Sequence, residues 1–180
     1  MRKIKVKNYS DVYIGEYPFH KQLKDELVPL LEKYPDVQGR KTNVLATMTE
    51  WDWNPENDRL KRLKNNIIEF VNYNCNEQEM RSLGDSIPNR YFMLDFWGNI
   101  YRKGDYTKPH CHRPESFSCV YFLKSKWYHS PLVFSDSEKK IRPTEGTFVI
   151  FPSHLNHLVP KHRYRETRIT LSGNMRIKTS

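Results

Sequence analysis

The stretch 101–123, YRKGDYTKPHCHRPESFSCVYFL, ends in a run of β-branched and aromatic residues that predicts a strand. Just before that run, His110 and His112 stand one residue apart. In an extended chain, alternate side chains point to the same face with their Cα atoms about 6.6 Å apart, so these two imidazoles can share one ion while Cys111 points away. A His-x-His pair alone is a weak indication of a metal site, because lone histidines usually lie at a surface or are hydrogen-bonded.

Similar runs occupy most of the second half of the chain. They are short, rich in β-branched and aromatic residues, and separated by turn residues: 90–102, 116–124, 131–136, 146–152, 157–160 and 167–174. No helical pattern lies between them. We therefore predict a mainly β protein, built as an antiparallel β-sandwich or barrel.

Two amphipathic helices are predicted in the first half, at 19–34 and 55–73, the second with Pro55 in its first turn. Their apolar residues recur at helical spacing: Leu23, Leu27, Leu30 and Leu31 in the first helix, and Leu60, Leu63, Ile67, Phe70 and Val71 in the second. Since each apolar face has to be covered, we expect both helices to pack on one outer face of the sandwich. No linker or repeat divides the 180 residues, which predicts a single domain.

Charge and cysteine content restrict the partners and the compartment. Lys and Arg number 30 against 21 Asp and Glu, a net charge of +9 that favours anionic partners such as an acidic protein or nucleic acid. The basic residues are dispersed, however, which favours solvated faces and leaves an anionic macromolecule as the alternative. No apolar run reaches the roughly 18 residues of a membrane span, and the start does not read as a secretory signal. An odd number of cysteines, Cys75, Cys111 and Cys119, predicts free thiols in the cytoplasm.

A third histidine and the last predicted strand extend the candidate site that His110 and His112 begin. His157 begins a strand in the segment FPSHLNHLVP, and the following strand alternates, with Arg168, Thr170, Ser172 and Asn174 on one face. A guanidinium followed two residues later by a hydroxyl can clamp a carboxylate. If this face is buried, each unpaired polar group costs about 1–3 kcal/mol, so a polar ligand is expected there; the alternative is a solvated face.

These segments resemble the iron(II)- and 2-oxoglutarate-dependent oxygenases. YRKGDYTKPHCH is similar to the prolyl 4-hydroxylase segment in which two tyrosines and a glycine lead into His-x-Asp. PLVFSD, PTEGTFVIFPSHLNHLVP, RITLSGN and, earlier, TNVLATMTEWDW resemble a group of such oxygenases from bacteria and phages, over roughly residues 42–176. The resemblance implies a double-stranded β-helix (jelly roll), with a helical flank and first strands at 1–80 and the jelly-roll core at 90–176.

The same resemblance implies an activity. It is hydroxylation of a small-molecule or peptide substrate, with a peptidyl or free amino acid favoured, using iron(II), 2-oxoglutarate and dioxygen. Arg168 matches the residue that binds the distal carboxylate of 2-oxoglutarate, and Thr170 lies at the serine position beside it. Tyr101 matches a tyrosine that can bond the same carboxylate, and Asn174 is a further candidate for this pocket.

The metal ligands match the family with one departure. His110 and His157 match its two histidine ligands, but His112 stands where the usual facial triad has Asp or Glu. Imidazole is a competent iron ligand, so His110, His112 and His157 form the predicted set, and Glu115 is the alternative third ligand if its loop folds back. Two other functions remain open: a three-histidine, cupin-type dioxygenase without 2-oxoglutarate, and a non-catalytic jelly-roll binding module.

Overall fold

Strands dominate the chain in the order that the residue patterns predict. The computed structural model describes residues 2–5, 10–74 and 91–178. The elements are β1 (Arg2–Lys5), β2 (Asp11–Glu16), α1 (His20–Glu32), β3 (Val44–Leu45), β4 (Thr47–Met48), α2 (Asp58–Asn74), β5 (Tyr91–Tyr101), β6 (Tyr106–His110), β7 (Phe117–Lys124), β8 (Leu132–Phe134), β9 (Lys139–Ile141), β10 (Thr147–Pro152), β11 (His157–Val159) and β12 (Arg168–Ile177). Every run predicted as a strand from residue 90 onward forms one.

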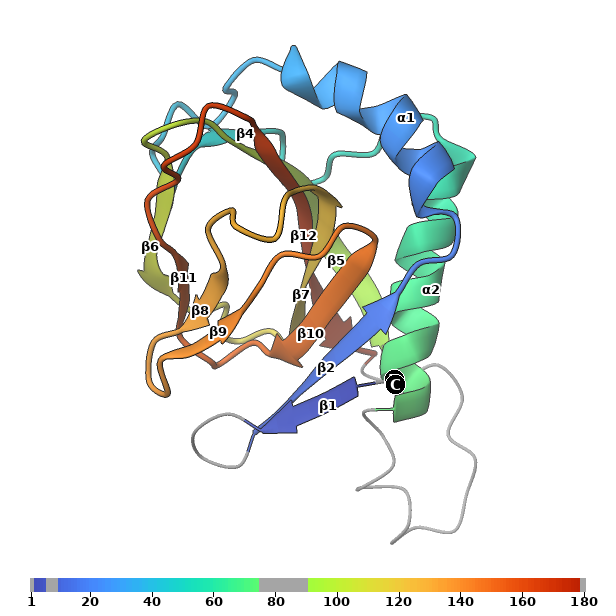
Figure 1. Cartoon of the computed structure of the whole chain (residues 1–180). Coiled ribbons are helices and arrows are strands. Elements are labelled where there is room, and N and C mark those ends of the chain that lie inside the picture. The colour runs from blue at the N-terminus through green and yellow to red at the C-terminus, as the bar shows by residue number, and fades with distance from the viewer. Residues whose placement is uncertain (1, 6–9, 75–90, 179–180) are drawn as a thin grey trace, which may run out of the picture.

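The strands of the described residues form two antiparallel sheets. The larger has seven strands in the order β1-β2-β10-β7-β12-β5-β4, and the smaller has five in the order β3-β6-β11-β8-β9. Neighbours in a sheet are often distant in sequence: β12, for example, lies between β7 and β5. Figure 1 shows the two sheets curving around a shared interior. This confirms the mainly β, double-stranded β-helix fold that the resemblance implied.

Both helices pack on the outer face of the larger sheet, as expected (Figure 1). The residues that each helix turns toward the sheet are fully buried: Leu23, Leu27 and Leu31 of α1, and Leu60, Leu63, Ile67 and Val71 of α2. They form one cluster with sheet residues such as Ile169 and Leu171 of β12. Burying each of these side chains contributes about 1.5–3 kcal/mol, so the helices are held mainly by this contact.

Two details of the helix prediction are wrong. Leu30 was assigned to the apolar face of the first helix but is 54% exposed, because it lies beside Leu31 and is turned away from the stripe that packs. The second helix begins at Asp58, so Pro55 precedes it instead of occupying its first turn. Asn57 caps that helix: its Oδ1 accepts the Leu60 N–H at 2.8 Å, satisfying one of the free donors at the helix start.

The last strand separates an apolar core from a polar interior. Ile169 and Leu171 point from β12 into the cluster beneath the helices. Arg168, Thr170 and Ser172 point the other way and line a pocket between the sheets. The predicted alternation is therefore confirmed, and both of its faces are buried.

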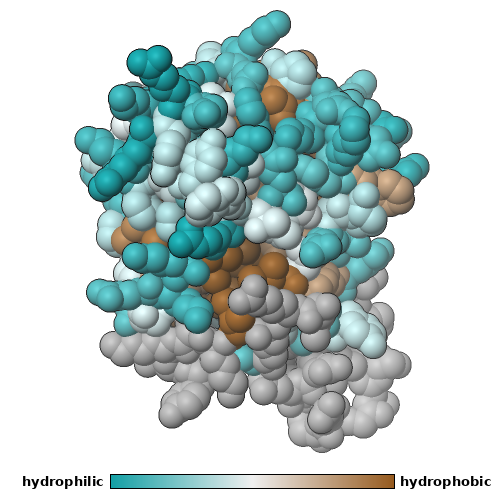
Figure 2. Space-filling view, in the orientation of Figure 1, coloured by the Kyte–Doolittle hydropathy of each residue, from teal (hydrophilic) through white to brown (hydrophobic). Residues whose placement is uncertain are grey.

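The face of the molecule in Figure 2 is mostly hydrophilic, and the described cysteines are unpaired. Figure 2 shows hydrophilic residues over most of the described face in view, with a hydrophobic area in its lower centre and smaller ones near its top and sides. Neither helix among the described residues combines the length and apolar content needed to cross a bilayer. Cys111 and Cys119 are free thiols, as expected, while Cys75 lies outside the described residues.

Candidate functional site

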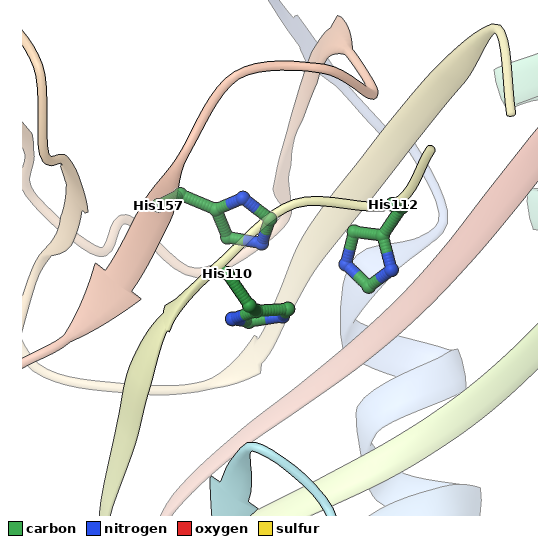
Figure 3. Close-up of side chains that lie close together, drawn as sticks. All are labelled: His110, His112 and His157. Carbon is green, nitrogen blue, oxygen red and sulfur yellow. The ribbon is translucent and has the colours of Figure 1, made fainter. Parts of the chain in front are cut away.

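Three histidines converge at the mouth of the β-helix. His110 ends β6, and His157 is its cross-strand partner at the start of β11. His112 lies beyond the end of β6, and its backbone N–H donates to the Ser153 carbonyl at 2.8 Å, which holds it beside the other two. Each residue offers one nitrogen such that these atoms all lie within 4.8 Å of one another. Figure 3 shows the three rings grouped around one region.

Backbone contacts set the tautomers of two of these rings. Nδ1 of His110 lies 2.8 Å from the Lys108 carbonyl, and Nδ1 of His157 lies 3.0 Å from the Leu155 carbonyl. Since a carbonyl oxygen only accepts, each Nδ1 carries the proton and donates it, which leaves a lone pair on Nε2 of the neutral ring. Metal-binding histidines typically donate a hydrogen bond from the ring nitrogen that does not bind the metal.

Burial keeps the three imidazoles neutral. It lowers the pKa of His110, and it lowers the pKa of His157 to about 3, with the nearby His110 and His112 adding to the effect. The pKa of His112 is lowered to about 4 by burial and by His110, while Glu115 opposes the shift. At neutral pH all three therefore present the deprotonated nitrogen that binds a metal.

Glu115 does not complete this group. Its carboxylate pairs with Arg176, accepting from Nε at 2.9 Å and from a terminal nitrogen at 2.6 Å. Within the described residues, the group of potential ligands at this place consists of His110, His112 and His157 alone. The imidazole of His112 thus occupies the position for which the sequence left Glu115 as an alternative.

A buried guanidinium lies deeper in the same pocket. Arg168 is 1% exposed, and none of its three guanidinium nitrogens makes a well-formed hydrogen bond to a described residue, although the Tyr101 side chain lies close enough to interact with the charge. Its Cζ lies 4.7 Å from the ring centre of Tyr101 and 5.5 Å from that of Phe122, so the charge lies against two aromatic rings. Burial lowers its pKa, and the neighbouring Tyr101 side chain opposes the shift. A buried charge without an anionic partner is costly, so this position is suited to binding an anion.

One narrow pocket joins the guanidinium to the histidines. Of the residues predicted for the site, it is lined by His110, His112, His157, Arg168, Thr170 and Tyr101. Thr170 is 1% exposed, and the Tyr101 hydroxyl is hydrogen-bonded to Thr107 Oγ1 at 2.8 Å. The arrangement offers a set of neutral nitrogen ligands at one end and a cation with hydroxyl groups at the other. These are the donors that suit a metal ion and a carboxylate.

The structure places Asn174 outside this pocket, which differs from the prediction. Its Oδ1 accepts from the Ser118 hydroxyl at 2.8 Å, and its Nδ2 donates to Asp95 at 3.2 Å. Asn174 keeps the strand face of Arg168, since Met175 still packs in the apolar cluster on the other face of β12. It lies beyond the end of the pocket, however, behind Ser118. The Asn174 amide is thus part of a structural network.

Sequence reasoning missed three polar residues of the pocket, Asn99, Thr107 and Ser118. Asn99 accepts from the Trp97 indole N–H at 3.1 Å and donates to the Ser172 hydroxyl at 3.0 Å. It precedes Tyr101 by two residues on β5, so strand alternation from Tyr101 is a signal that finds it. No sequence pattern identifies Thr107. Its place in the pocket is evident only from its hydrogen bond to the Tyr101 hydroxyl in the folded chain.

The fold, unlike the sequence, has clear relatives. No family model and no curated protein sequence matches the chain. Among solved structures, a Pseudomonas putida prolyl-4-hydroxylase is similar with a TM-score of 0.65 at 17% identity over 93% of each chain. The viral collagen prolyl hydroxylase of Paramecium bursaria Chlorella virus-1, solved with 2OG, gives 0.63 at 16% identity, over 91% of this chain and 95% of that one.

A third structure extends the comparison to a peptide complex. The prolyl hydroxylase of Trichoplax adhaerens, bound to a hypoxia inducible factor peptide fragment, has a TM-score of 0.63 at 13% identity, over 91% of this chain and 82% of that one. At this level of identity the similarity establishes the fold. Over about nine-tenths of its length, this chain has the double-stranded β-helix fold of the prolyl hydroxylases.

Proposed function

We propose that this protein is an iron(II)- and 2-oxoglutarate-dependent dioxygenase that hydroxylates a peptidyl or free amino acid. The observation that carries the proposal is the buried guanidinium of Arg168, which no carboxylate among the described residues neutralises, in the same pocket as three convergent imidazoles. The fold it shares with prolyl hydroxylases, one of them solved with 2OG and another with a peptide, supports the same activity. Proline within a peptide is the substrate that these neighbours favour.

Each residue has a separate task in this proposal. His110, His112 and His157 hold iron(II) through neutral nitrogens, and Arg168 with Thr170 receives the distal carboxylate of 2-oxoglutarate. Tyr101 packs against the guanidinium and holds it in place. When bound, the iron supplies redox chemistry that consumes dioxygen and 2-oxoglutarate and yields succinate, carbon dioxide and a hydroxylated product. The protein contributes position, exclusion of water and choice of substrate.

The third imidazole changes the charge of the centre. A carboxylate ligand leaves an iron(II) site with a formal charge of +1, whereas three neutral imidazoles leave +2. The higher charge favours an anionic co-ligand such as a 2-oxo acid. Three protein ligands would also leave coordination positions of the iron free for a co-ligand such as a 2-oxo acid.

A second candidate is a three-histidine dioxygenase that does not use 2-oxoglutarate. The all-histidine group favours it, because no carboxylate of the usual triad lies among these ligands. The buried guanidinium of Arg168 argues against it, since that reaction gives this charge no anion to bind. Succinate formation separates the two, and it also separates either enzyme from a non-catalytic binding module.

The test combines metal analysis with product analysis. The wild-type protein is expected to bind one equivalent of iron(II), and His157→Ala to lose it, because this change removes a ligand whose ring is already oriented. His154→Ala is the matched control: His154 is exposed and lies in the neighbouring turn. Full iron occupancy in the His157 variant, or an absence of succinate with iron, 2-oxoglutarate and proline peptides, would contradict the proposal.

A further inference from the structure

A second, wider pocket lies on the outer side of the histidines. It has a volume of about 400 Å³ and shares His110, His112 and Trp97 with the narrow pocket that contains Arg168. Any group bound in it is therefore adjacent to the proposed metal centre, on the side away from the proposed cosubstrate site. This is the position from which a substrate can reach the metal.

An accessible tryptophan forms one wall of this outer pocket. Trp51 is 41% exposed, and its ring centre lies 4.7 Å from that of the buried Trp97. Trp97 in turn lies 6.0 Å from the ring of His112. The tryptophans thus form a continuous aromatic surface that leads from solvent to the candidate metal ligands. An exposed indole with a rigid aromatic support suits an apolar group of a ligand.

Positive charge is concentrated beside this aromatic surface. Lys41 and Lys108 both line the outer pocket and are exposed. Among the residues that the structure describes, neither ammonium has a carboxylate partner, and no Asp or Glu lines the pocket. Arg40, the neighbouring cation, is instead paired with Asp105 at 2.8 Å. The free charge is therefore localised at two lysines.

We propose that the outer pocket binds the substrate and selects an acidic peptide. A carboxylate next to the hydroxylated residue lies between Lys41 and Lys108, and an apolar part of the peptide packs on Trp51. This inference rests on the proposed function. Two localised cations suit one or two carboxylates, whereas nucleic acid is usually bound by a longer track of cations along its phosphates.

The first measurement compares peptides that differ only in charge. Fluorescein-labelled peptides with a central proline flanked by Glu, by Gln or by Lys are titrated with the protein, with iron(II) and 2-oxoglutarate present under nitrogen, and followed by fluorescence anisotropy. We expect affinity to fall in the order Glu, Gln, Lys, with roughly fivefold between the first two, as for exposed ion pairs. Added salt should reduce the preference, because these charges are solvent-exposed. Equal affinities for the three peptides would overturn the inference.

Two double variants locate the effect. The double variant with Lys41→Glu and Lys108→Glu should reverse the order of the affinities for the three peptides. Lys139→Glu with Lys140→Glu is the matched control, because it changes the net charge equally at β9, at the opposite edge of the same sheet from β3. An equal loss in both double variants would show that net charge alone is responsible and would overturn the proposed site.

A third variant separates apolar from electrostatic binding. Trp51→Ala should lower the affinity for all three peptides by a similar factor, roughly tenfold, as expected when an aromatic anchor is removed. A single-stranded oligonucleotide serves as the competitor of another class. If it binds more tightly than the Glu peptide and depends on the same two lysines, the assignment to a peptide is overturned.

Succinate release keeps this inference separate from the proposed function. Succinate formed equally with all three peptides would leave the oxygenase assignment standing and overturn the acidic-peptide inference. A charge preference that is reversed by the Lys41 and Lys108 changes, without succinate from any peptide, would support the peptide site and overturn the oxygenase assignment.

Discussion

At the scale of single residues, Arg168 determines the electrostatics of the pocket. Its guanidinium is fully enclosed, contacts the faces of Tyr101 and Phe122, and makes no well-formed hydrogen bond to a described residue. Such a charge lowers the stability of the ligand-free protein, because water is removed from it without an anion in exchange. Residues that destabilise a fold in this way are typical of binding sites.

Replacing Arg168 with Met should therefore raise the stability of the ligand-free protein while it removes the cosubstrate site. We expect the free energy of unfolding to increase by about 1–4 kcal/mol, as when buried charges are exchanged for apolar residues. Affinity for 2-oxoglutarate should fall at least about tenfold, since a bidentate ion pair is lost. Urea unfolding and calorimetry measure the two effects. Arg163→Met, at an exposed position, should change neither; unchanged 2-oxoglutarate affinity in the Arg168 variant would place the carboxylate elsewhere.

Substitutions at His112 test whether it is the third ligand. His112→Asp should retain iron and some 2-oxoglutarate turnover, because a carboxylate at this position restores the usual two-histidine, one-carboxylate set. His112→Ala should weaken iron binding and abolish hydroxylation or uncouple it from 2-oxoglutarate consumption. Iron content and succinate release are measured for both variants. Glu115→Gln is the control, since its carboxylate is paired with Arg176, and it should keep wild-type iron content. Wild-type behaviour of the Ala variant would exclude His112 as a ligand.

At the scale of elements, the segment after β6 decides where His112 lies. The strand ends at His110, and the chain then turns and is held from both sides. His112 N–H donates to the Ser153 carbonyl at 2.8 Å, and Ser116 N–H donates to the Met175 carbonyl at 3.0 Å. Because the turn after β10 and the strand β12 anchor the segment, the His112 ring stays beside His110 without a continuous strand.

The first helix provides a matched pair of substitutions on one element. Leu27 is fully buried against the larger sheet, whereas Leu30 is 54% exposed. Leu27→Ala should lower the free energy of unfolding by about 2–5 kcal/mol, because it leaves a cavity in the core. Leu30→Ala should change it by less than about 0.5 kcal/mol, the usual range for a surface site. Urea denaturation measures both, and equal losses would mean that the helix packs through a different face.

At the scale of the whole molecule, the neutral histidines make stability depend on pH. The pKa of His157 is lowered to about 3 and that of His112 to about 4, both from an ordinary value of 6.5. At a pH between the lowered pKa of the folded state and the ordinary pKa of the unfolded state, the unfolded chain binds protons that the folded chain does not. The stability of the metal-free protein should therefore be complete above about pH 6.5 and fall as the pH drops toward 4.

Urea unfolding of the metal-free protein at several pH values between 7 and 4 measures this dependence. His157→Gln should flatten the decline, because it removes the group with the largest shift. Other buried histidines contribute as well, since burial also lowers the pKa of His129 to about 4. A decline of equal steepness in the variant would show that His157 is not among the groups responsible.

Local patterns in the sequence were sufficient to predict the elements and most of the residues that line the candidate site. Helical spacing identified the faces of α1 and α2, and strand alternation placed Arg168 and Thr170 opposite Ile169 and Leu171, because both periodicities follow from backbone geometry alone. The resemblance supplied the fold and the histidines that the structure brings together. The errors at Leu30 and Pro55 concern the edge of a face and the end of a helix, where local signals are weakest.

Only the tertiary structure decided which neighbours compete for each polar group. Glu115 and Asn174 had suitable chemistry for the site, but Arg176 holds the first, and Asp95 with Ser118 holds the second. Arg168 shows the opposite case, since no carboxylate among the described residues neutralises its guanidinium. Hydrogen bonds and ion pairs between residues far apart in the chain depend on distances of a few ångströms that only the packed sheets set. The sequence alone therefore determined the candidate residues and their strand faces, and the packing of the sheets determined which of them are free to bind a ligand.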